Sequence, residues 1–332
     1  MLAKNSPLEV VEMPDASPGP GEVKIAIEAS GICHSDAHYR AGFGDVAFPR
    51  TPGHEIAGVV AAVGDDVSSV SAGDRVAVHY LVSCGACWSC RNAGEQFCET
   101  GQMIGKHRDG GYAESLVVPA VNAIPIPPNV SFAAAAIMMC STATAYHALR
   151  LAGVGPGTKV AILGFGGLGV SALHLSRVLG AERIAAVDVI PAKLSAAEAL
   201  GAVPIDSRRQ RVTEELNRFD VAVDFTGRSE VSVAALRALA PGGRLVLVAL
   251  SEAQLPFNPY RDVLGKERRI VGCSDHLREE LFDLMRFAAE GRLDLSTVIS
   301  RRVPLDARAI NGALDELDRG SDSLRTVIEP RS

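Results

Sequence analysis

The chain has 332 residues, of which 47% are hydrophobic and 5% aromatic, and its formal net charge is −6 at pH 7. This length is enough for two ordinary domains, and the apolar composition is typical of α/β proteins rather than of disordered or fibrous chains. A negative net charge offers no long-range attraction to nucleic acid or to anionic membranes, so we expect neither as a partner.

The start of the chain, MLAKNSPLEVVEMPD, lacks the basic and then apolar profile of a secretory signal. The best candidate for a membrane span, residues 132–149, is rich in Ala and interrupted by Ser, Thr and His, so we interpret it as a buried helix. We therefore expect a soluble, cytoplasmic protein. In such a reducing compartment, cysteines bind metal more often than they form disulfides.

Short apolar or alternating segments in the first third of the chain predict β-strands separated by turns, at residues 22–30, 56–64 and 74–82. From about residue 131, strands and helices alternate. The predicted strands begin at 159, 183, 220 and 243, and helices are predicted at 191–200 and 229–239. This alternation predicts a doubly wound parallel sheet. We expect this parallel-sheet domain at 141–274 and a β-rich domain formed by 1–140 and 275–332.

A glycine-rich turn follows the strand that begins at Lys159. The stretch LGFGGLG fits the G-x-G-x-x-G pattern, in which glycines permit a tight turn, a close approach to a pyrophosphate and close helix packing. The helix that follows would direct its free N–H groups at the phosphates. The candidate cofactor-binding residues here are Gly164, Gly166, Gly167, Leu168 and Gly169.

Asp188 ends the next predicted strand, where a carboxylate can accept hydrogen bonds from an adenosine ribose. A carboxylate there repels a 2′-phosphate, and no Arg follows directly in DVIPAK, so we predict NAD(H) rather than NADP(H). Lys193 of the same stretch is a further candidate for cofactor binding. The alternative is that the glycines form only a tight turn and that Asp188 caps a helix.

Four of the seven cysteines lie in SCGACWSCRNAGEQFC with the spacing C-x₂-C-x₂-C-x₇-C. Four thiolates so spaced can surround one tetrahedral zinc ion and leave no open position, which makes a closed, structural site. The predicted ligands of this zinc knuckle, residues 84–98, are Cys84, Cys87, Cys90 and Cys98. Two disulfides and a redox C-x-x-C motif are the alternatives.

A second metal site is predicted from residues that are far apart in the chain. Cys33 and His54 would provide one sulfur and one imidazole, and Cys140 is the natural third ligand. Three protein ligands leave one position open, as a catalytic zinc requires. Taken singly, each cysteine could be a small buried hydrophobe and His54 a loop histidine. Together the two sites imply two zinc ions per chain.

The sequence resembles the zinc-dependent alcohol dehydrogenases of the medium-chain dehydrogenase/reductase superfamily. The matching pieces occur in family order along nearly the whole chain: GICHSDAH, PGHEIAGVV, CGACWSCRNAGEQFC, GGYAES, CSTATAYHAL, GFGGLG and RTVI. The resemblance implies a GroES-like catalytic domain beside a Rossmann coenzyme domain, and it implies the same two sets of zinc ligands.

The resemblance also implies roles for further residues. It places Ser35 and His38 in a proton relay, Asp36 beside the ligating histidine and Glu55 near the metal. It places His34 and Arg325 against the cofactor pyrophosphate. Without the flanking motif, Ser35 and Asp36 would be read as turn residues.

The implied activity is reversible, NAD-linked oxidation of primary or secondary alcohols to aldehydes or ketones, with hydride leaving a zinc-bound alkoxide. A polyol dehydrogenase of the same superfamily is an alternative, although such enzymes tend to use a glutamate where this chain has Cys140. A non-catalytic zinc-binding scaffold of the same fold is the alternative from another class. The compact length resembles members that are often homotetramers, and a dimer is the alternative.

Overall fold

The computed structural model describes residues 1–320 and 324–331 and divides the chain into two units. Unit 1 comprises Met1–Ala143 with Leu277–Ser332, and unit 2 comprises Thr144–His276. The unit boundaries thus lie at residues 143 and 276, whereas the sequence predicted them at 140 and 274. The first difference arises because that boundary falls inside an uninterrupted helical run, Phe132–Leu151.

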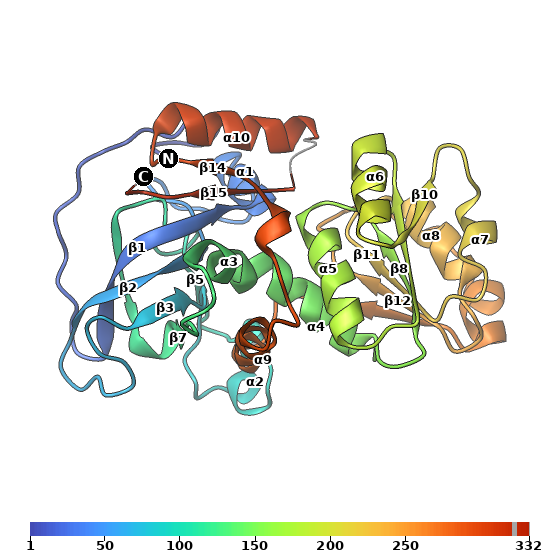
Figure 1. The fold of residues 1–332 in the computed structure, drawn as a ribbon, viewed down its shortest axis with the longest axis horizontal. Helices are drawn as coiled ribbons and strands as arrows, with labels where there is room; N and C mark the ends of the chain where they lie inside the picture. Colours follow the sequence, from blue (N-terminus) through green and yellow to red (C-terminus); the bar gives the residue numbers. More distant parts are fainter. Residues whose placement is uncertain (321–323, 332) are drawn as a thin grey trace. The chain divides into compact units, whose positions relative to one another are not determined.

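Unit 1 is built on an open seven-stranded sheet (Figure 1). Its strand order is β14-β15-β1-β2-β3-β7, and β6 also pairs with β1. A small two-stranded sheet, β4-β5, lies apart from it. The strands are β1 (Glu22–Ile32), β2 (Glu55–Val63), β3 (Arg75–Val78), β4 (Leu81–Val82), β5 (Gln102–Met103), β6 (Ser115–Pro119), β7 (Ala123–Pro125), β14 (Ile299–Val303) and β15 (Arg325–Ile328).

The α-helices that lie wholly in unit 1 are α1 (His34–Arg40), α2 (Trp88–Arg91), α3 (Phe132–Ile137), α9 (Arg278–Ala289) and α10 (Ala307–Arg319). The local sequence sets both ends of helix α10: Asp306 caps its first turn, and Gly320 ends it with a φ of 85°. Its apolar face packs near α1, which holds α1 beside the end of β1 (Figure 1).

Unit 2 is a six-stranded sheet in which every pair is parallel. Its order, β10-β9-β8-β11-β12-β13, reverses at β8, as in dinucleotide-binding folds. The strands are β8 (Lys159–Leu163), β9 (Arg183–Asp188), β10 (Val203–Asp206), β11 (Val221–Asp224), β12 (Arg244–Leu247) and β13 (Arg269–Gly272). The helices are α5 (Gly167–Val178), α6 (Pro191–Ala199), α7 (Val212–Glu215), α8 (Ser229–Ala238) and, except for its first residue, α4 (Ala143–Leu151).

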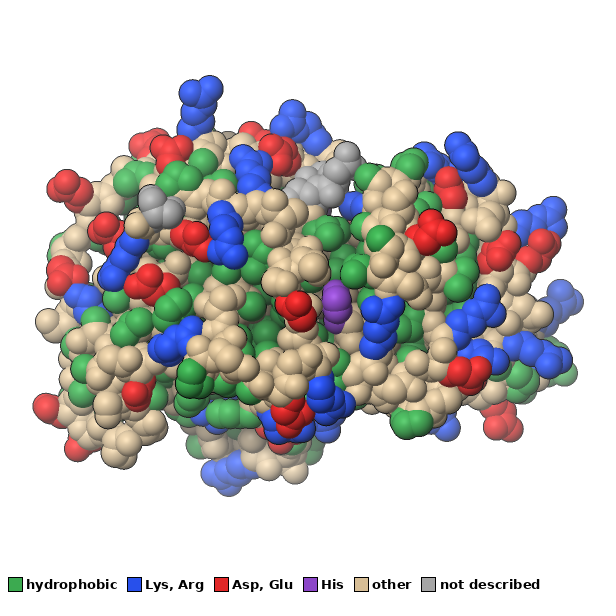
Figure 2. Space-filling model, viewed as in Figure 1, with side chains coloured by type: hydrophobic (Ala, Val, Ile, Leu, Met, Phe, Trp, Pro, Cys, Tyr) green, Lys and Arg blue, Asp and Glu red, His purple; other side chains and the backbone are tan. Residues whose placement is uncertain are grey.

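Helices α5, α6 and α8 pack against this sheet (Figure 1). Because helices cover it, the strands are continuous apolar runs rather than alternating ones. Among the described residues, one helical run, Phe132–Leu151, is long and apolar enough to cross a bilayer, but 83% of its most apolar window is buried inside the protein. Acidic and basic side chains are interspersed over the face that Figure 2 shows.

Candidate active site

Four potential metal ligands from separate parts of unit 1 converge in its interior: Cys33, His54, Glu55 and Cys140. Their ligand atoms all lie within 4.8 Å of one another. Cys33 caps α1, directly after β1, while His54 and Glu55 stand at the start of β2. The pairing of Gly31 with Glu55 between these strands brings the two strand ends together.

Cys140 reaches this cluster from a short π-helical segment, η3 (Met138–Thr142), within the long helical run. Such bulges are frequent at functional sites because they redirect one side chain without ending the helix. The Sγ atom of Cys140 lies 3.3 Å from Nε2 of His54. The hydrogen bond between the two thiols lowers the pKa of Cys33 and raises that of Cys140, so one thiolate is already favoured.

Asp36 holds the ligating histidine from its other side. Its Oδ1 lies 3.1 Å from Nδ1 of His54, which leaves Nε2 directed at the cluster. Burial alone would lower the pKa of His54, but Asp36 raises it well above its ordinary value. Asp36 also accepts a hydrogen bond of 2.8 Å from the hydroxyl of Tyr112, which the sequence had not singled out.

Glu55 forms a buried ion pair with Arg325 of β15. The two side chains are 0% and 5% exposed. They meet over Gly31, the residue of β1 that lies between them, and a Cβ at this glycine would stand 2.0 Å from Glu55 Oε2. Burial, opposed by Arg325, raises the pKa of Glu55 to about 7. The structure thus places Arg325 against Glu55, a pairing that the sequence did not predict.

A zinc ion fits this donor set. Two cysteine sulfurs and an imidazole nitrogen are preferred zinc ligands, and tetrahedral coordination would separate sulfur and nitrogen by about 3.6 Å. The 3.3 Å between Cys140 and His54 is close to that value. Oε1 of Glu55 is buried beside the same cluster and has no hydrogen-bond partner among the described residues, so this carboxylate could supply a further ligand.

Helix α1 carries the three residues expected to act in proton transfer and phosphate binding. Ser35 is half-buried in its first turn. The rings of His34 and His38 lie 4.6 Å apart, and burial, followed by repulsion from His34, lowers the pKa of His38. Nε2 of His34 lies 3.4 Å from Asp318 of α10. These roles remain predictions.

The glycine turn between β8 and α5 has the geometry expected of a phosphate-binding loop. Gly164 has a φ of +90°, which side chains rarely allow, and Gly166 is the N-cap of α5. A Cβ at Gly169 would lie 2.2 Å from the carbonyl oxygen of Gly164, so only glycine permits this close approach. Gly167 and Leu168 form the first turn of α5, whose N-terminus is a suitable anion site.

Asp188 ends β9 and is tied to this turn. Its Oδ2 accepts a 2.7 Å hydrogen bond from the amide of Phe165, and its Oδ1 accepts from Val189 and Ile190. A carboxylate has about four acceptor sites, so at least one remains for a ribose hydroxyl. Lys193 is half-buried in α6, which follows Asp188 directly.

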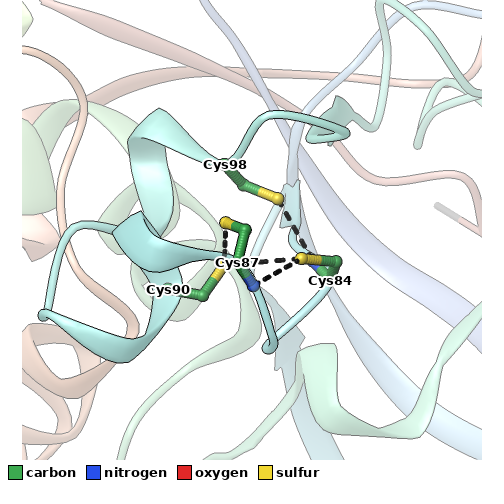
Figure 3. Close-up of side chains that lie close together, drawn as sticks. All are labelled: Cys84, Cys87, Cys90 and Cys98. Carbon is green, nitrogen blue, oxygen red and sulfur yellow. Dashed lines mark hydrogen bonds between the residues drawn. The ribbon is translucent and has the colours of Figure 1, made fainter.

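The four remaining cysteine ligands form the predicted knuckle around α2 and the short helix η1 (Glu95–Phe97) (Figure 3). Their sulfurs lie within 4.8 Å of one another. Cys90 lies 3.9 Å from Cys84 and 3.5 Å from Cys87. Tetrahedral zinc would separate sulfurs by about 3.8 Å, whereas a disulfide needs about 2.05 Å. Within residues 1–320 all seven cysteines are free thiols.

The backbone of the knuckle favours thiolates. The amides of Ala86 and Cys87 donate to Sγ of Cys84 and lower the pKa of its thiol to about 6. Burial raises the pKa of Cys90 to about 12, so the cluster as a whole needs a cation before all four sulfurs ionise.

The chain combines two features: a doubly wound sheet with a phosphate-binding glycine turn, and a metal site made of thiolates and an imidazole. Together they are typical of metal-dependent oxidoreductases that use a dinucleotide. Residues 19–128 match the alcohol dehydrogenase GroES-like domain, and residues 167–290 match the zinc-binding dehydrogenase family.

Known proteins resemble the chain over its whole length. An alcohol dehydrogenase from Geobacillus stearothermophilus is 34% identical over 331 residues, covering 97% of this chain and 96% of that protein. An L-idonate 5-dehydrogenase from Vitis vinifera is 32% identical over 327 residues, with 93% and 88% covered. The structure of an alcohol dehydrogenase from Thermus sp. ATN1 superimposes with a TM-score of 0.91 at 28% identity, covering 100% of this chain and 99% of the other.

The chain therefore belongs to the zinc-binding alcohol dehydrogenases of the medium-chain dehydrogenase/reductase superfamily, which confirms the resemblance and the fold class predicted from the sequence. It is an oxidoreductase, so the comparisons speak against the alternative of a non-catalytic scaffold.

Proposed function

We propose that the protein interconverts primary or secondary alcohols with aldehydes or ketones, using NAD(H) and two zinc ions per chain. The observation that carries this proposal is the convergence of Cys33, His54 and Cys140, with His54 oriented by Asp36. When bound, zinc supplies the positive charge that acidifies an alcohol oxygen, and the nicotinamide supplies the site that accepts hydride.

The residues of this chain would position the reactants and move the proton. Asp36 fixes the tautomer of His54, so that Nε2 is available as a ligand. The hydroxyl of Ser35 would accept the proton released by the alcohol and pass it toward His38. Burial and His34 lower the pKa of His38, so its imidazole is neutral near pH 7 and can take up that proton.

A substrate panel tests this function. Primary alcohols, secondary alcohols and polyols, with the corresponding carbonyl compounds, are followed by nicotinamide absorbance. Turnover of simple alcohols supports the proposal, whereas turnover confined to polyols supports the polyol dehydrogenase alternative. Cys140 favours the first outcome, and the similarity to an L-idonate 5-dehydrogenase is the reason to include the second. No turnover of either class would refute the proposal.

The proposed preference for NAD(H) gives a direct prediction. The Asp188 carboxylate stands at the end of β9 and would repel a 2′-phosphate, so we expect kcat/KM with NAD to exceed that with NADP by about 100-fold. Asp188→Asn keeps the size of the side chain but removes its charge, and should reduce the ratio to about tenfold or less. Steady-state kinetics with both cofactors measure this ratio. Equal efficiency in the wild-type enzyme would contradict the prediction.

The zinc content gives a second prediction. The unaltered protein should contain two zinc ions per chain, and Cys87→Ala should contain one, because three sulfurs hold the knuckle ion far more weakly than four. Elemental analysis after dialysis measures the difference. Cys273→Ala, which changes a half-buried cysteine of unit 2, is the matched control and should keep both ions. A full zinc content in Cys87→Ala would contradict the assignment of the knuckle.

We also propose a cytoplasmic homotetramer, with a dimer as the alternative. Among the described strands, β13 pairs only with β12, so it leaves one edge of the sheet open to a second chain. Leu250, Tyr260 and Leu264 of the same unit are 69%, 70% and 67% exposed, which suits burial in an assembly. Light scattering of the purified protein distinguishes the two states.

A further inference from the structure

The carboxylate of Asp36 accepts four hydrogen bonds, and their donors come from three separate segments. Oδ1 accepts from the amide of Gly53 at 3.2 Å and lies 3.1 Å from Nδ1 of His54. Oδ2 accepts from the amide of Cys33 at 3.0 Å and from the hydroxyl of Tyr112 at 2.8 Å. Each oxygen therefore has two donors, which uses all of the about four acceptor sites of an ionised carboxylate.

Of the four donors, Tyr112 is the one whose hydrogen bond a substitution can remove without altering a backbone amide or a metal ligand. Two of the other donors are backbone amides, and the third belongs to a metal ligand. Since an ionised carboxylate can only accept, the phenol must donate its proton to Asp36. Asp36 is 0% exposed, so no water can replace this hydroxyl without a change in packing.

The ring of Tyr112 also packs against the chain immediately before His54. Gly53 has a φ of +97°, and a Cβ there would lie 2.4 Å from Cδ1 of this ring. The amide of Tyr112 donates to Pro52 at 3.0 Å, and the amide of Gly111 donates to Gly53 at 2.8 Å. Both the backbone and the ring of Tyr112 thus contact the segment that carries His54.

We infer that Tyr112 is a positioning residue for the metal centre: its hydroxyl completes the hydrogen bonding of Asp36, which then holds Nε2 of His54 toward Cys33 and Cys140. This inference rests on the proposed function, because it assumes that zinc occupies the cluster. Without the hydroxyl, Oδ2 keeps one donor, and Asp36 can rotate or share its charge differently with His54. The ligand is then less well oriented, and the affinity for zinc falls.

The test is Tyr112→Phe, which keeps the ring on Gly53 and removes only the hydroxyl. Outer hydrogen-bond partners of this kind are typically worth about 10- to 100-fold in metal affinity. Competition with a chromophoric chelator should therefore show a zinc dissociation constant raised by about 10- to 100-fold at this site. The knuckle zinc provides an internal reference that should not change. Tyr146→Phe, at a buried tyrosine in α4 of unit 2, is the matched control.

A double-mutant comparison separates positioning from packing. If Tyr112 acts through Asp36, then Tyr112→Phe should add almost nothing to the loss of zinc affinity already caused by Asp36→Asn. Additive losses would mean that the hydroxyl of Tyr112 acts independently of the Asp36 carboxylate, which would overturn the inference.

The outcomes also distinguish this inference from the proposed function. If the wild-type enzyme binds zinc at the knuckle alone, the proposed function fails and the inference fails with it. If the wild-type enzyme binds the second zinc tightly and Tyr112→Phe binds it equally well, only the inference is refuted.

Discussion

Replacing Cys140 by alanine is expected to lower kcat/KM by about 1,000-fold, since a catalytic metal contributes several kcal/mol to transition-state stabilisation and each 1.36 kcal/mol is worth about tenfold in rate. The remaining ligands, Cys33 and His54, would hold zinc far less tightly. The zinc content should fall to the one ion of the knuckle. Steady-state kinetics and elemental analysis on the same preparation measure both effects.

Cys273→Ala is again the control, because it removes a thiol of unit 2 and should keep both activity and zinc. Activity that persists in Cys140→Ala within about tenfold of the wild-type level would remove Cys140 from the ligand set, since a loss below 1.4 kcal/mol is too small for a missing zinc ligand. Loss of activity with both zinc ions retained would point instead to a change in the surrounding pocket.

Much of the fold could be predicted because its cause is local. The strands of unit 2 are buried on both faces, so they are continuous apolar runs, and the glycine turn after β8 marks the first crossover. The boundaries of the units were harder to place. The helical run Phe132–Leu151 contains neither Gly nor Pro and continues without a break across residue 143, so its sequence gives no sign that unit 1 ends there.

The sequence predicts some parts of the site better than others, and the reason is again whether the residues are close together in the chain. The knuckle ligands lie within fifteen residues, so their spacing alone indicated a metal site. Cys140 is 86 residues from His54, and only the resemblance to a family joined them. The contact of Tyr112 with Asp36 spans 76 residues, and that of Arg325 with Glu55 spans 270. Contacts of this range depend on strand register, which no local pattern reveals.

Replacing Arg325 by methionine is expected to destabilise the protein by about 3–5 kcal/mol, the usual cost of removing one partner of a buried ion pair. Glu55 would then be buried without its cation. Urea unfolding of the metal-free proteins measures the change, because a bound cation would itself compensate Glu55. Arg331→Met is the matched control. It breaks the exposed pair with Glu28, 57% and 28% exposed, and should cost at most about 1 kcal/mol.

The loss of stability in Arg325→Met should become larger as the pH rises. Burial raises the pKa of Glu55 to about 7 while Arg325 opposes that rise, so without Arg325 the folded-state pKa lies higher still. The unfolded chain keeps the ordinary value near 4.5. Below that pH both states hold the proton and the variant loses least. Between that pH and about 7, Glu55 keeps its proton in both folded proteins, so the deficit of Arg325→Met relative to the wild-type protein stays constant. As the pH rises through about 7, the folded wild-type protein releases a proton that the folded variant retains, so the deficit grows until the pH reaches the higher folded pKa of the variant.

A double variant tests whether the unpaired charge is the cause. Glu55→Gln combined with Arg325→Met removes both charges and should recover most of the stability, because a neutral pair leaves no carboxylate to desolvate. A double variant that stays as unstable as Arg325→Met would mean that the arginine acts by filling space beside Gly31. A deficit that does not change with pH would exclude Glu55 as its source, since this carboxylate is the group whose protonation Arg325 opposes.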